Sequence, residues 1–370
     1  MTSTVNEAAA AVQAEPVQLL TPDGERRTDH PLAASVADID DHALARLYRD
    51  MVLVRRIDAE GVALQRQGQL GLWAPAEGQE AIQTAMVRAC NDDDFFFTSY
   101  RELGVLVARG AEPAQLVLGW RGEVFGTFDP HDLHVATPQI IIGAQTLHAV
   151  GYAMGVQRDG GDQVAVACFG DGATSQGDVN EAMVFAASFG APVVFVCSNN
   201  QWAISEPVGL QAHRPLADRA PGFGIPSLRV DGNDVLACTA AMRWALERAR
   251  SGEGPAYIEA VTYRLGPHTT SDDPTRYRTA EEVALWRTRD PLLRVAALLR
   301  GRGLLEQADA EADAAAAEFT AGMRRAAVGA TTRPPLAILD HVYAEPHTGL
   351  DRQREQFAAY LAGFDEEAGA

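Results

Sequence analysis

Hydrophobic positions near the start of the chain follow the period of an α-helix. Between residues 40 and 66, apolar side chains recur every three or four positions, and Asp40 stands where a helix N-cap is expected, so the pattern predicts a helix over 40–66. Two further helices are expected at 78–90 and 101–109. Residues 1–38 show no sustained period, which favours an extended, largely disordered arm.

Farther along the chain, short apolar runs alternate with helical stretches. The runs at 164–169 and 192–197 are almost continuously apolar, as in strands that are buried on both faces of a sheet. The expected strands cover 164–169, 192–197, 227–230 and 257–263, and the expected helices cover 145–157, 178–189, 234–250, 280–300 and 306–327. This alternation predicts an α/β fold, a doubly wound parallel sheet with helical flanks at 40–66 and 280–327. We therefore expect one domain over 39–370, with a frayed acidic tail at 365–370.

Charge and composition exclude several classes of function. The 370 residues carry 31 basic and 50 acidic side chains, a net charge of −19, which argues against a nucleic acid partner because such proteins need a basic surface. Every basic residue is an arginine, and the absence of lysine excludes Schiff-base chemistry and the P-loop lysine. No apolar run approaches the roughly 18 residues of a membrane helix, and the N-terminus lacks a secretory pattern. Four widely spaced cysteines suit reduced thiols, so we expect a soluble cytoplasmic protein.

Two polar turns follow neighbouring strands of the predicted sheet. Gly170-Asp171-Gly172 comes directly after one strand, and Asn199-Asn200 follows the next. A dinucleotide fingerprint does not fit, because Ser175 stands where the third glycine should be. Parallel strands that are joined through one helix end at the same edge of a sheet, so we expect Asp171 and Asn200 to face each other. A carboxylate and an amide oxygen are hard ligands, which predicts a Mg²⁺ site that holds a diphosphate.

These turns resemble the thiamine diphosphate signature. The chain between about residues 45 and 305 resembles the alpha subunit of the decarboxylating dehydrogenase component of 2-oxo acid dehydrogenase complexes, bacterial pyruvate dehydrogenase type. Further segments that carry the resemblance are Gly78-Gln79-Glu80, Ser99-Tyr100-Arg101-Glu102, Pro138–Gln145 and Gly266-Pro267-His268. The resemblance implies the thiamine diphosphate-binding fold, with thiamine diphosphate and Mg²⁺ as cofactors.

The resemblance also assigns roles to individual residues. The side chains of Asp171 and Asn200 and the carbonyl of Trp202 would bind Mg²⁺, while Tyr100 and Arg101 would hold the terminal phosphate. An arginine suits that role because its guanidinium binds phosphate with two donors and keeps its charge. The implied cofactor contacts are Tyr100, Arg101, Ile140, Ile142, Gly170, Asp171, Gly172, Ala173, Asn200, Trp202, Ala203, Ile204 and His268.

Two loops are expected to complete the site. By the resemblance, the backbone at Ile140 binds the aminopyrimidine ring and the side chain of Ile142 bends the cofactor, although three consecutive isoleucines also fit a plain buried strand. His268 lies in a polar loop and matches the family's catalytic histidine, which we expect to titrate near neutrality. Thr269 and Ser271 stand where mammalian relatives are phosphorylated, and we expect no such regulation here without a kinase.

Two further features leave alternatives open. Trp73 either lines an acyl pocket, where its indole would limit the size of the substrate, or packs in the core. His131 and His134 stand three residues apart, but Asp129-Pro130 favours a loop there, and we predict no metal site. Unlike animal pyruvate-type relatives, the chain has no histidine just before Gly78.

The resemblance implies oxidative decarboxylation of pyruvate with transfer of the acyl group to lipoamide. Branched-chain 2-oxo acids and acetoin are alternative substrates, and a non-catalytic binding subunit is a further alternative. We find no second domain that could supply the carboxylate needed to protonate the aminopyrimidine. The resemblance therefore implies a separate beta subunit, in a heterotetramer of two alpha and two beta chains, and a lipoyl-bearing acyltransferase as a further partner.

Overall fold

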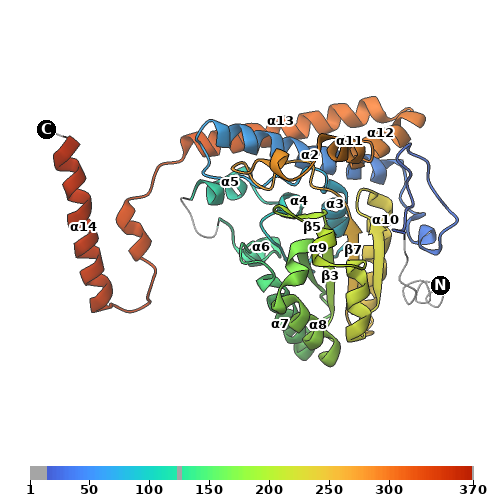
Figure 1. Ribbon diagram of the computed structural model, residues 1–370, viewed down its shortest axis with the longest axis horizontal. Helices are drawn as coiled ribbons and strands as arrows, with labels where there is room; N and C mark the ends of the chain where they lie inside the picture. The colour runs from blue at the N-terminus through green and yellow to red at the C-terminus, as the bar shows by residue number, and fades with distance from the viewer. Residues whose placement is uncertain (1–14, 123–126, 369–370) are drawn as a thin grey trace. The chain divides into compact units, whose positions relative to one another are not determined.

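A parallel five-stranded sheet forms the centre of the fold (Figure 1). The computed structural model describes residues 15–122 and 127–368. The strands run in the order β1-β2-β3-β7-β6, and every neighbouring pair is parallel. Their bounds are β1 (Phe95–Phe97), β2 (Ala165–Gly170), β3 (Val193–Asn199), β6 (Ser227–Asp231) and β7 (Ala256–Val261). The predicted α/β sheet is confirmed, and β1 is an additional short edge strand that the pattern did not predict.

Alternate residues of the central strands face two separate hydrophobic cores. The helices involved are α2 (Asp41–Arg66), α3 (Glu80–Ala89), α7 (Ala144–Asp159), α8 (Gly177–Phe189) and α10 (Val235–Arg250). On one face of the sheet, Val166 and Cys168 pack with apolar residues of α2, α3 and α10. On the other face, Ala167 and Phe169 pack with α7 and α8. Side chains alternate along a strand, so each central strand contributes to both cores. Because helices cover both faces of the sheet, almost every position in these strands is apolar.

Further helices and two short strands complete this part of the molecule. They are η1 (Pro31–Val36), α4 (Leu103–Ala108), α5 (Pro113–Arg121), α6 (Pro130–Leu133), η2 (Asp171–Ser175), β4 (Trp202–Ala203), β5 (Glu206–Pro207), α9 (Val208–Gln211), η3 (Leu216–Phe223), η4 (Pro274–Arg276), α11 (Ala280–Arg287), α12 (Pro291–Gly301) and α13 (Leu305–Gly329). In the described part of the chain, no helix is long and apolar enough to cross a bilayer.

Two predictions of local structure are wrong. The helix expected over 280–300 is divided into α11 and α12, because Pro291 occupies the first turn of α12 and the carboxylate of Asp290 caps it through the Leu292 amide at 2.8 Å. The loop expected after Asp129 contains the short helix α6, whose first turn the Asp129 carboxylate caps. In both cases an aspartate–proline pair starts a helix.

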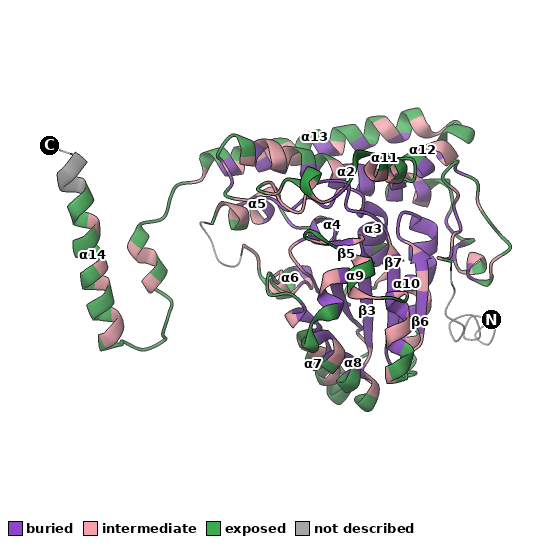
Figure 2. Ribbon diagram, viewed as in Figure 1, coloured by how far each residue is buried: buried purple, intermediate pink, exposed green. Residues whose placement is uncertain are grey.

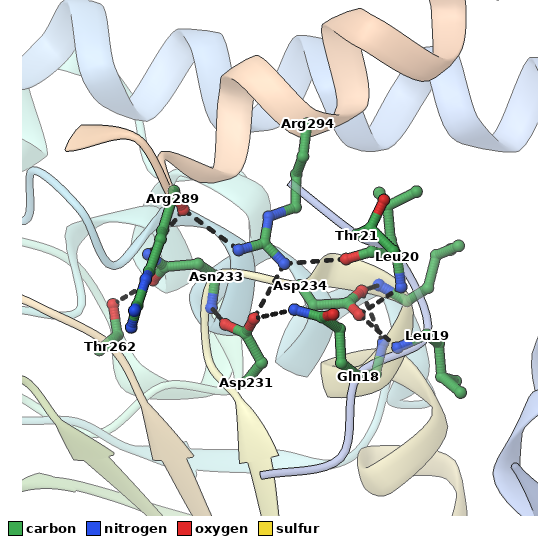
Figure 3. A network of polar contacts seen from close by, with 12 residues as sticks. Gln18, Leu19, Leu20, Thr21, Asp231, Asn233, Asp234, Thr262, Arg289 and Arg294 are labelled. Atoms are coloured by element: carbon green, nitrogen blue, oxygen red, sulfur yellow. Dashed lines mark hydrogen bonds and ion pairs between the residues drawn. The ribbon is translucent and has the colours of Figure 1, made fainter. Parts of the chain in front are cut away.

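The N-terminal segment of the described chain packs against β6 and the start of α10 (Figure 3). It pairs with β6 through an isolated parallel bridge. The buried carboxylate of Asp234, at the N-cap of α10, accepts hydrogen bonds from the amides of Leu19 and Leu20, both at 2.6 Å. The buried guanidinium of Arg294 donates to the Leu20 carbonyl at 2.9 Å. The prediction of a disordered arm is therefore wrong for residues 15–38, and the residues before them lie outside the described chain.

Residues 329–368 form a unit that is separate from the preceding part of the chain. This unit contains η5 (Pro335–Leu339) and the helix α14 (Thr348–Ala368). Over 329–364, where side-chain burial is described, none of its residues is buried (Figure 2). The tail that was expected to fray from residue 365 continues as helix to Ala368.

Candidate functional site

One cavity of about 460 Å³ lies where β2 and β3 end and gathers the residues predicted to bind a cofactor. Among the residues that line it are Tyr100, Arg101, Ile140, Ile142, Gly170, Asp171, Gly172, Ala173, Asn200, Trp202, Ala203, Ile204 and His268, which is every predicted contact. Other lining residues, which the sequence did not mark as cofactor contacts, are Leu72, Ala74, Gln79, Ser99, Glu102, Trp120, Gly143, Gln145 and Thr269. The carboxyl edge of a parallel sheet is where α/β proteins bind ligands.

The turn after β2 carries the first predicted metal ligand. Asp171 is buried, and its carboxylate accepts a hydrogen bond from the Gln211 side chain at 3.2 Å. Burial raises the pKa of Asp171 to about 6, against an opposing effect of hydrogen bonds that include one from the Asn200 backbone. At Gly172, a Cβ atom would stand 2.8 Å from the Cβ of Ala203, so glycine is needed for the two turns to approach this closely. A bound cation would favour the charged form of this buried carboxyl group.

The turn after β3 brings Asn200 and Trp202 to the same cavity. Oδ1 of Asn200 accepts a hydrogen bond from the Trp202 amide at 3.2 Å, and Nδ2 donates to Oε1 of Gln79 at 3.3 Å. Gln201 and Ile204 have φ values of 73° and 56°, in the left-handed region that is unfavourable for residues with a Cβ atom. Surrounding contacts must therefore hold this backbone in place.

Buried side chains from β7 and the loop after it hold the turn. The carboxylate of Glu259 accepts hydrogen bonds from the Asn199 side chain at 2.7 Å and from the Ala217 amide at 2.8 Å. The guanidinium of Arg264 donates to the carbonyls of Trp202 at 2.9 Å and Ile204 at 2.8 Å. Glu259 and Arg264 were missed at the sequence level because no local motif marks them, and their partners lie about 60 residues away in the chain.

The donor set around Asp171 suits a hard cation. Asp171 offers a carboxylate, Asn200 an amide oxygen and Trp202 a backbone carbonyl, and all three residues line the cavity. Arg264 uses one lone pair of the Trp202 carbonyl, which leaves the second for another partner. The described residues contain no group of three or more histidine, cysteine or acidic side chains that could hold a metal ion by themselves. A metal held here would therefore need further oxygen ligands from a bound molecule, such as a diphosphate, or from water.

Arg101 and His268 form a second polar group at the cavity. Nη1 of Arg101 donates to the Pro75 carbonyl at 2.6 Å, and Nη2 lies 3.0 Å from the His268 carbonyl and 3.1 Å from its Nδ1. Because arginine can only donate, Nδ1 accepts and the imidazole proton resides on Nε2. Burial, together with the charges of Arg101 and Arg264, lowers the pKa of His268 to about 4. The expectation that His268 titrates near neutrality is therefore wrong, and its ring is neutral at pH 7.

The three isoleucines before α7 do not form a buried strand. Ile140 is 74% exposed and Ile142 is 39% exposed, and both line the cavity. The segment turns into α7 at Gly143, whose φ of 87° a residue with a side chain would rarely adopt. This arrangement excludes the buried strand and leaves the side chain of Ile142 at the cavity, where the resemblance requires it.

Trp73 packs in the core and does not line the cavity. Its side chain is fully buried, its indole Nε1 donates to Asp58 at 3.1 Å, and a Cβ atom on Gly61 would collide with its ring. Of the two alternatives for Trp73, the core position is correct. Besides Trp202, one further tryptophan lines the cavity, Trp120 at the end of α5, which was not predicted although Pro113 stands at the first position of this helix.

The remaining predicted residues lie at the edge of the site or outside it. Thr269 lines the cavity, and its hydroxyl lies 3.0 Å from that of Ser271. His134 ends α6, and its Nδ1 lies 3.0 Å from Nη2 of Arg109. His131 and His134 are not among the residues that line the cavity.

Known proteins of one family match most of the chain. The model of the family described as dehydrogenase E1 component matches residues 48–338. The chain belongs to this family. It is 48% identical to the 3-methyl-2-oxobutanoate dehydrogenase subunit alpha of Mycobacterium tuberculosis over 361 residues, 96% of each chain. It is also similar to the pyruvate dehydrogenase E1 component subunit alpha of Bacillus cereus, with 43% identity over 81% of this chain and 80% of the relative. The same subunit of Staphylococcus epidermidis is 39% identical over 92% of each chain.

Family membership confirms the resemblance found in the sequence and makes the protein an E1 dehydrogenase, an oxidoreductase. The family also implies thiamine diphosphate as the cofactor. The cavity suits that molecule, because oxygen donors at the strand ends can bind a cation beside a diphosphate and exposed isoleucines offer an apolar surface to a ring.

Proposed function

We propose that this chain is the alpha subunit of a thiamine diphosphate-dependent 2-oxo acid dehydrogenase, which decarboxylates its substrate and passes the acyl group to lipoamide. The observation that carries the proposal is the single cavity in which all the predicted cofactor contacts meet. Pyruvate, the first expectation from the sequence, is supported by the similarity to pyruvate dehydrogenase subunits. A branched-chain substrate, 3-methyl-2-oxobutanoate, is the second candidate, favoured by the higher identity to the mycobacterial subunit over nearly the whole chain.

We infer that Mg²⁺ accompanies the cofactor. Its protein ligands would be the carboxylate of Asp171, the amide oxygen of Asn200 and the carbonyl of Trp202, and diphosphate oxygens or water would complete an octahedral set. The raised pKa of Asp171 supports this inference, because a neighbouring cation would stabilise the buried carboxylate.

The residues of this chain would bind and orient the cofactor and the substrate, while the cofactor, when bound, supplies the nucleophile and the electron sink for loss of CO₂. Arg101 holds the His268 ring through Nδ1, so the ring remains neutral and presents its Nε2–H as a donor. We propose that this donor hydrogen-bonds the substrate oxygen, or the acyl group during its transfer. Tyr100, whose ring packs edge-on against that of His268, would restrict the imidazole's orientation.

A beta subunit would complete the site. Of the carboxylates that line the cavity, Asp171 is assigned to the cation and Glu102 accepts hydrogen bonds from Ser99. By the family resemblance, we propose that the carboxylate that protonates the aminopyrimidine comes from the beta chain of a heterotetramer, with a lipoyl-bearing acyltransferase as the acceptor of the acyl group. The four free cysteines fit a reducing compartment, and we propose the cytoplasm.

Reconstitution tests this function. The purified chain, its beta subunit and both together are assayed with thiamine diphosphate, Mg²⁺ and pyruvate, 3-methyl-2-oxobutanoate or acetoin as substrate. We expect turnover of a 2-oxo acid only by the mixture. Decarboxylation by this chain alone would contradict the shared site. If the mixture prefers acetoin, acetoin and not a 2-oxo acid is the substrate. An inactive mixture that still binds the cofactor would favour a non-catalytic binding subunit.

A further inference from the structure

One wall of the cavity is an extended segment that also holds the His268 loop. The amide of Trp73 donates to the Thr270 hydroxyl at 3.1 Å, and the Thr270 amide donates to the Trp73 carbonyl at 2.9 Å. Side chains alternate along an extended chain, so Leu72 and Ala74 line the cavity while Trp73 points into the core. The apolar side chains of Leu72 and Ala74 therefore lie beside the loop that carries His268.

Trp120 extends this apolar wall. It lies at the end of α5, its carbonyl accepts a hydrogen bond from the Gly71 amide at 3.0 Å, and its side chain lines the cavity. The bond to Gly71 places it directly beside Leu72. Of the five tryptophans, only Trp120 and Trp202 line the cavity, and Trp202 lies in the turn after β3.

The Trp120 ring has rigid support behind it. It packs on the indole of Trp73, with ring centroids 5.6 Å apart and planes tilted by 50°. Trp73 cannot retreat, because its Nε1 is bonded to the buried carboxylate of Asp58 and its ring lies against Gly61. Asp58 also accepts from the Ala76 amide at 2.6 Å, which fixes the far end of the same segment. A side chain that pressed on Trp120 would therefore meet a closely packed core.

We propose that the indole of Trp120 limits the length of the acyl side chain that this protein accepts. The inference rests on the proposed function, because it assigns the apolar wall beside His268 to the part of a 2-oxo acid that differs between substrates. Oxygen donors line the strand-end part of the cavity, and the apolar wall is formed by Leu72, Ala74 and Trp120. A methylene group in an apolar pocket changes kcat/KM by roughly 10- to 200-fold, so one aromatic ring is enough to set a preference.

The test measures kcat/KM of the reconstituted holoenzyme for pyruvate, 3-methyl-2-oxobutanoate and 4-methyl-2-oxopentanoate. In Trp120→Ala, we expect the ratio of the longest substrate to pyruvate to rise by about tenfold or more, with an intermediate rise in Trp120→Leu. Thiamine diphosphate affinity, measured by calorimetry, should stay within about twofold, because the indole is not one of the polar groups assigned to the diphosphate. Trp244→Ala, which removes an indole from α10 outside the cavity lining, is the matched control and should leave the ratio unchanged.

The outcomes separate this inference from the proposed function. If wild-type holoenzyme converts none of the three acids, the proposed function fails. If wild type is active and folded Trp120→Ala or Trp120→Leu keeps the wild-type ratio, Trp120 does not set chain length and the inference is overturned. If Trp120→Ala does not fold, Trp120→Leu decides alone. A ratio that shifts equally in Trp244→Ala also overturns it, since the effect would then not come from the cavity.

Discussion

Two regions that line the same cavity are held in place in different ways. The strand-end turns, Gly170–Ala173 and Asn199–Ile204, continue directly from β2 and β3, whose register pairs Gly170 with Ser198. The His268 loop, residues 266–277, is positioned mainly by side-chain hydrogen bonds, from Asp272 and Tyr277 within it and from Arg101 and Arg264 outside it. The first region continues the backbone of the sheet, with Glu259 and Arg264 as additional supports, whereas the second depends mainly on individual hydrogen bonds.

The contacts of the His268 loop show this dependence. The carboxylate of Asp272 accepts hydrogen bonds from the His268 amide at 2.8 Å and from the Tyr277 hydroxyl at 2.5 Å. The same hydroxyl accepts a hydrogen bond from Arg264 at 2.8 Å. Arg101 donates to the His268 carbonyl at 3.0 Å. Single substitutions should therefore release the loop, but in the strand-end turns they should remove a ligand and leave the backbone in place.

The largest effect is expected from Asp171→Ala. The variant removes the only carboxylate of the proposed Mg²⁺ site but leaves the register of β2 and β3 unchanged. Changes behind a metal ligand cost 10- to 100-fold in affinity, so loss of a charged ligand should cost roughly 100-fold or more. Calorimetric titration with thiamine diphosphate and Mg²⁺ measures the loss, with circular dichroism as a control for folding. Wild-type affinity in this variant would refute the metal assignment.

Asp272→Ala should have the next largest effect and should separate the two regions. It removes the acceptor of the His268 amide and the Tyr277 hydroxyl, and hydrogen bonds to a charged group contribute about 1.5–3 kcal/mol. We expect the rate of amide hydrogen exchange over residues 266–277 to rise by about 10- to 100-fold, which corresponds to the loss of about 1.5–3 kcal/mol. Exchange at the turns after β2 and β3 should not change. Equal acceleration in both regions would mean that the loop and the turns are one structural unit.

Tyr277→Phe removes one member of the same network. The pKa of Tyr277 is raised to about 12 by burial and by its bond to Asp272, so the hydroxyl is a neutral donor at pH 7. Its loss should lower the free energy of unfolding by about 1 kcal/mol, measured by denaturant titration. Thr275→Val, at an exposed hydroxyl of the adjacent turn, is the control and should change stability less. A greater loss in the control would contradict the role assigned to Tyr277.

A small pH effect should also arise in the His268 loop. The pKa of His268 is about 4 in the folded protein, below the 6.5 of an unperturbed histidine. Between these values the unfolded chain binds more protons, so this residue makes stability fall as the pH decreases from 6.5 to 4. Because the ring is partly exposed, we expect about 1 kcal/mol or less. Thermal unfolding of wild type and His268→Gln across this range measures it, and parallel curves would exclude a contribution from His268.

Much of the site could be predicted because its signals are local. Gly170-Asp171-Gly172 and Asn199-Asn200 each follow an apolar strand, and parallel crossover geometry brings such strand ends together without knowledge of any other contact. Helix α5 was missed despite local evidence, namely Pro113 at its first turn, a capping box at Glu112 and Gly122 at its end. Without that helix, Trp120 was not recognised as a residue of the cavity.

The sequence by itself determined the alternation of the central strands and helices, the sheet class and the positions of the two strand-end turns. Those properties depend on neighbours a few residues apart, through side-chain period and turn chemistry. Only the tertiary structure decided that Trp120 and not Trp73 lines the cavity, that His268 is neutral, and that residues 15–38 are ordered. Each of these depends on partners far away in the chain, such as Thr270 for Trp73 or Arg101 for His268. Burial and electrostatic effects are properties of packed surroundings, which no local pattern encodes.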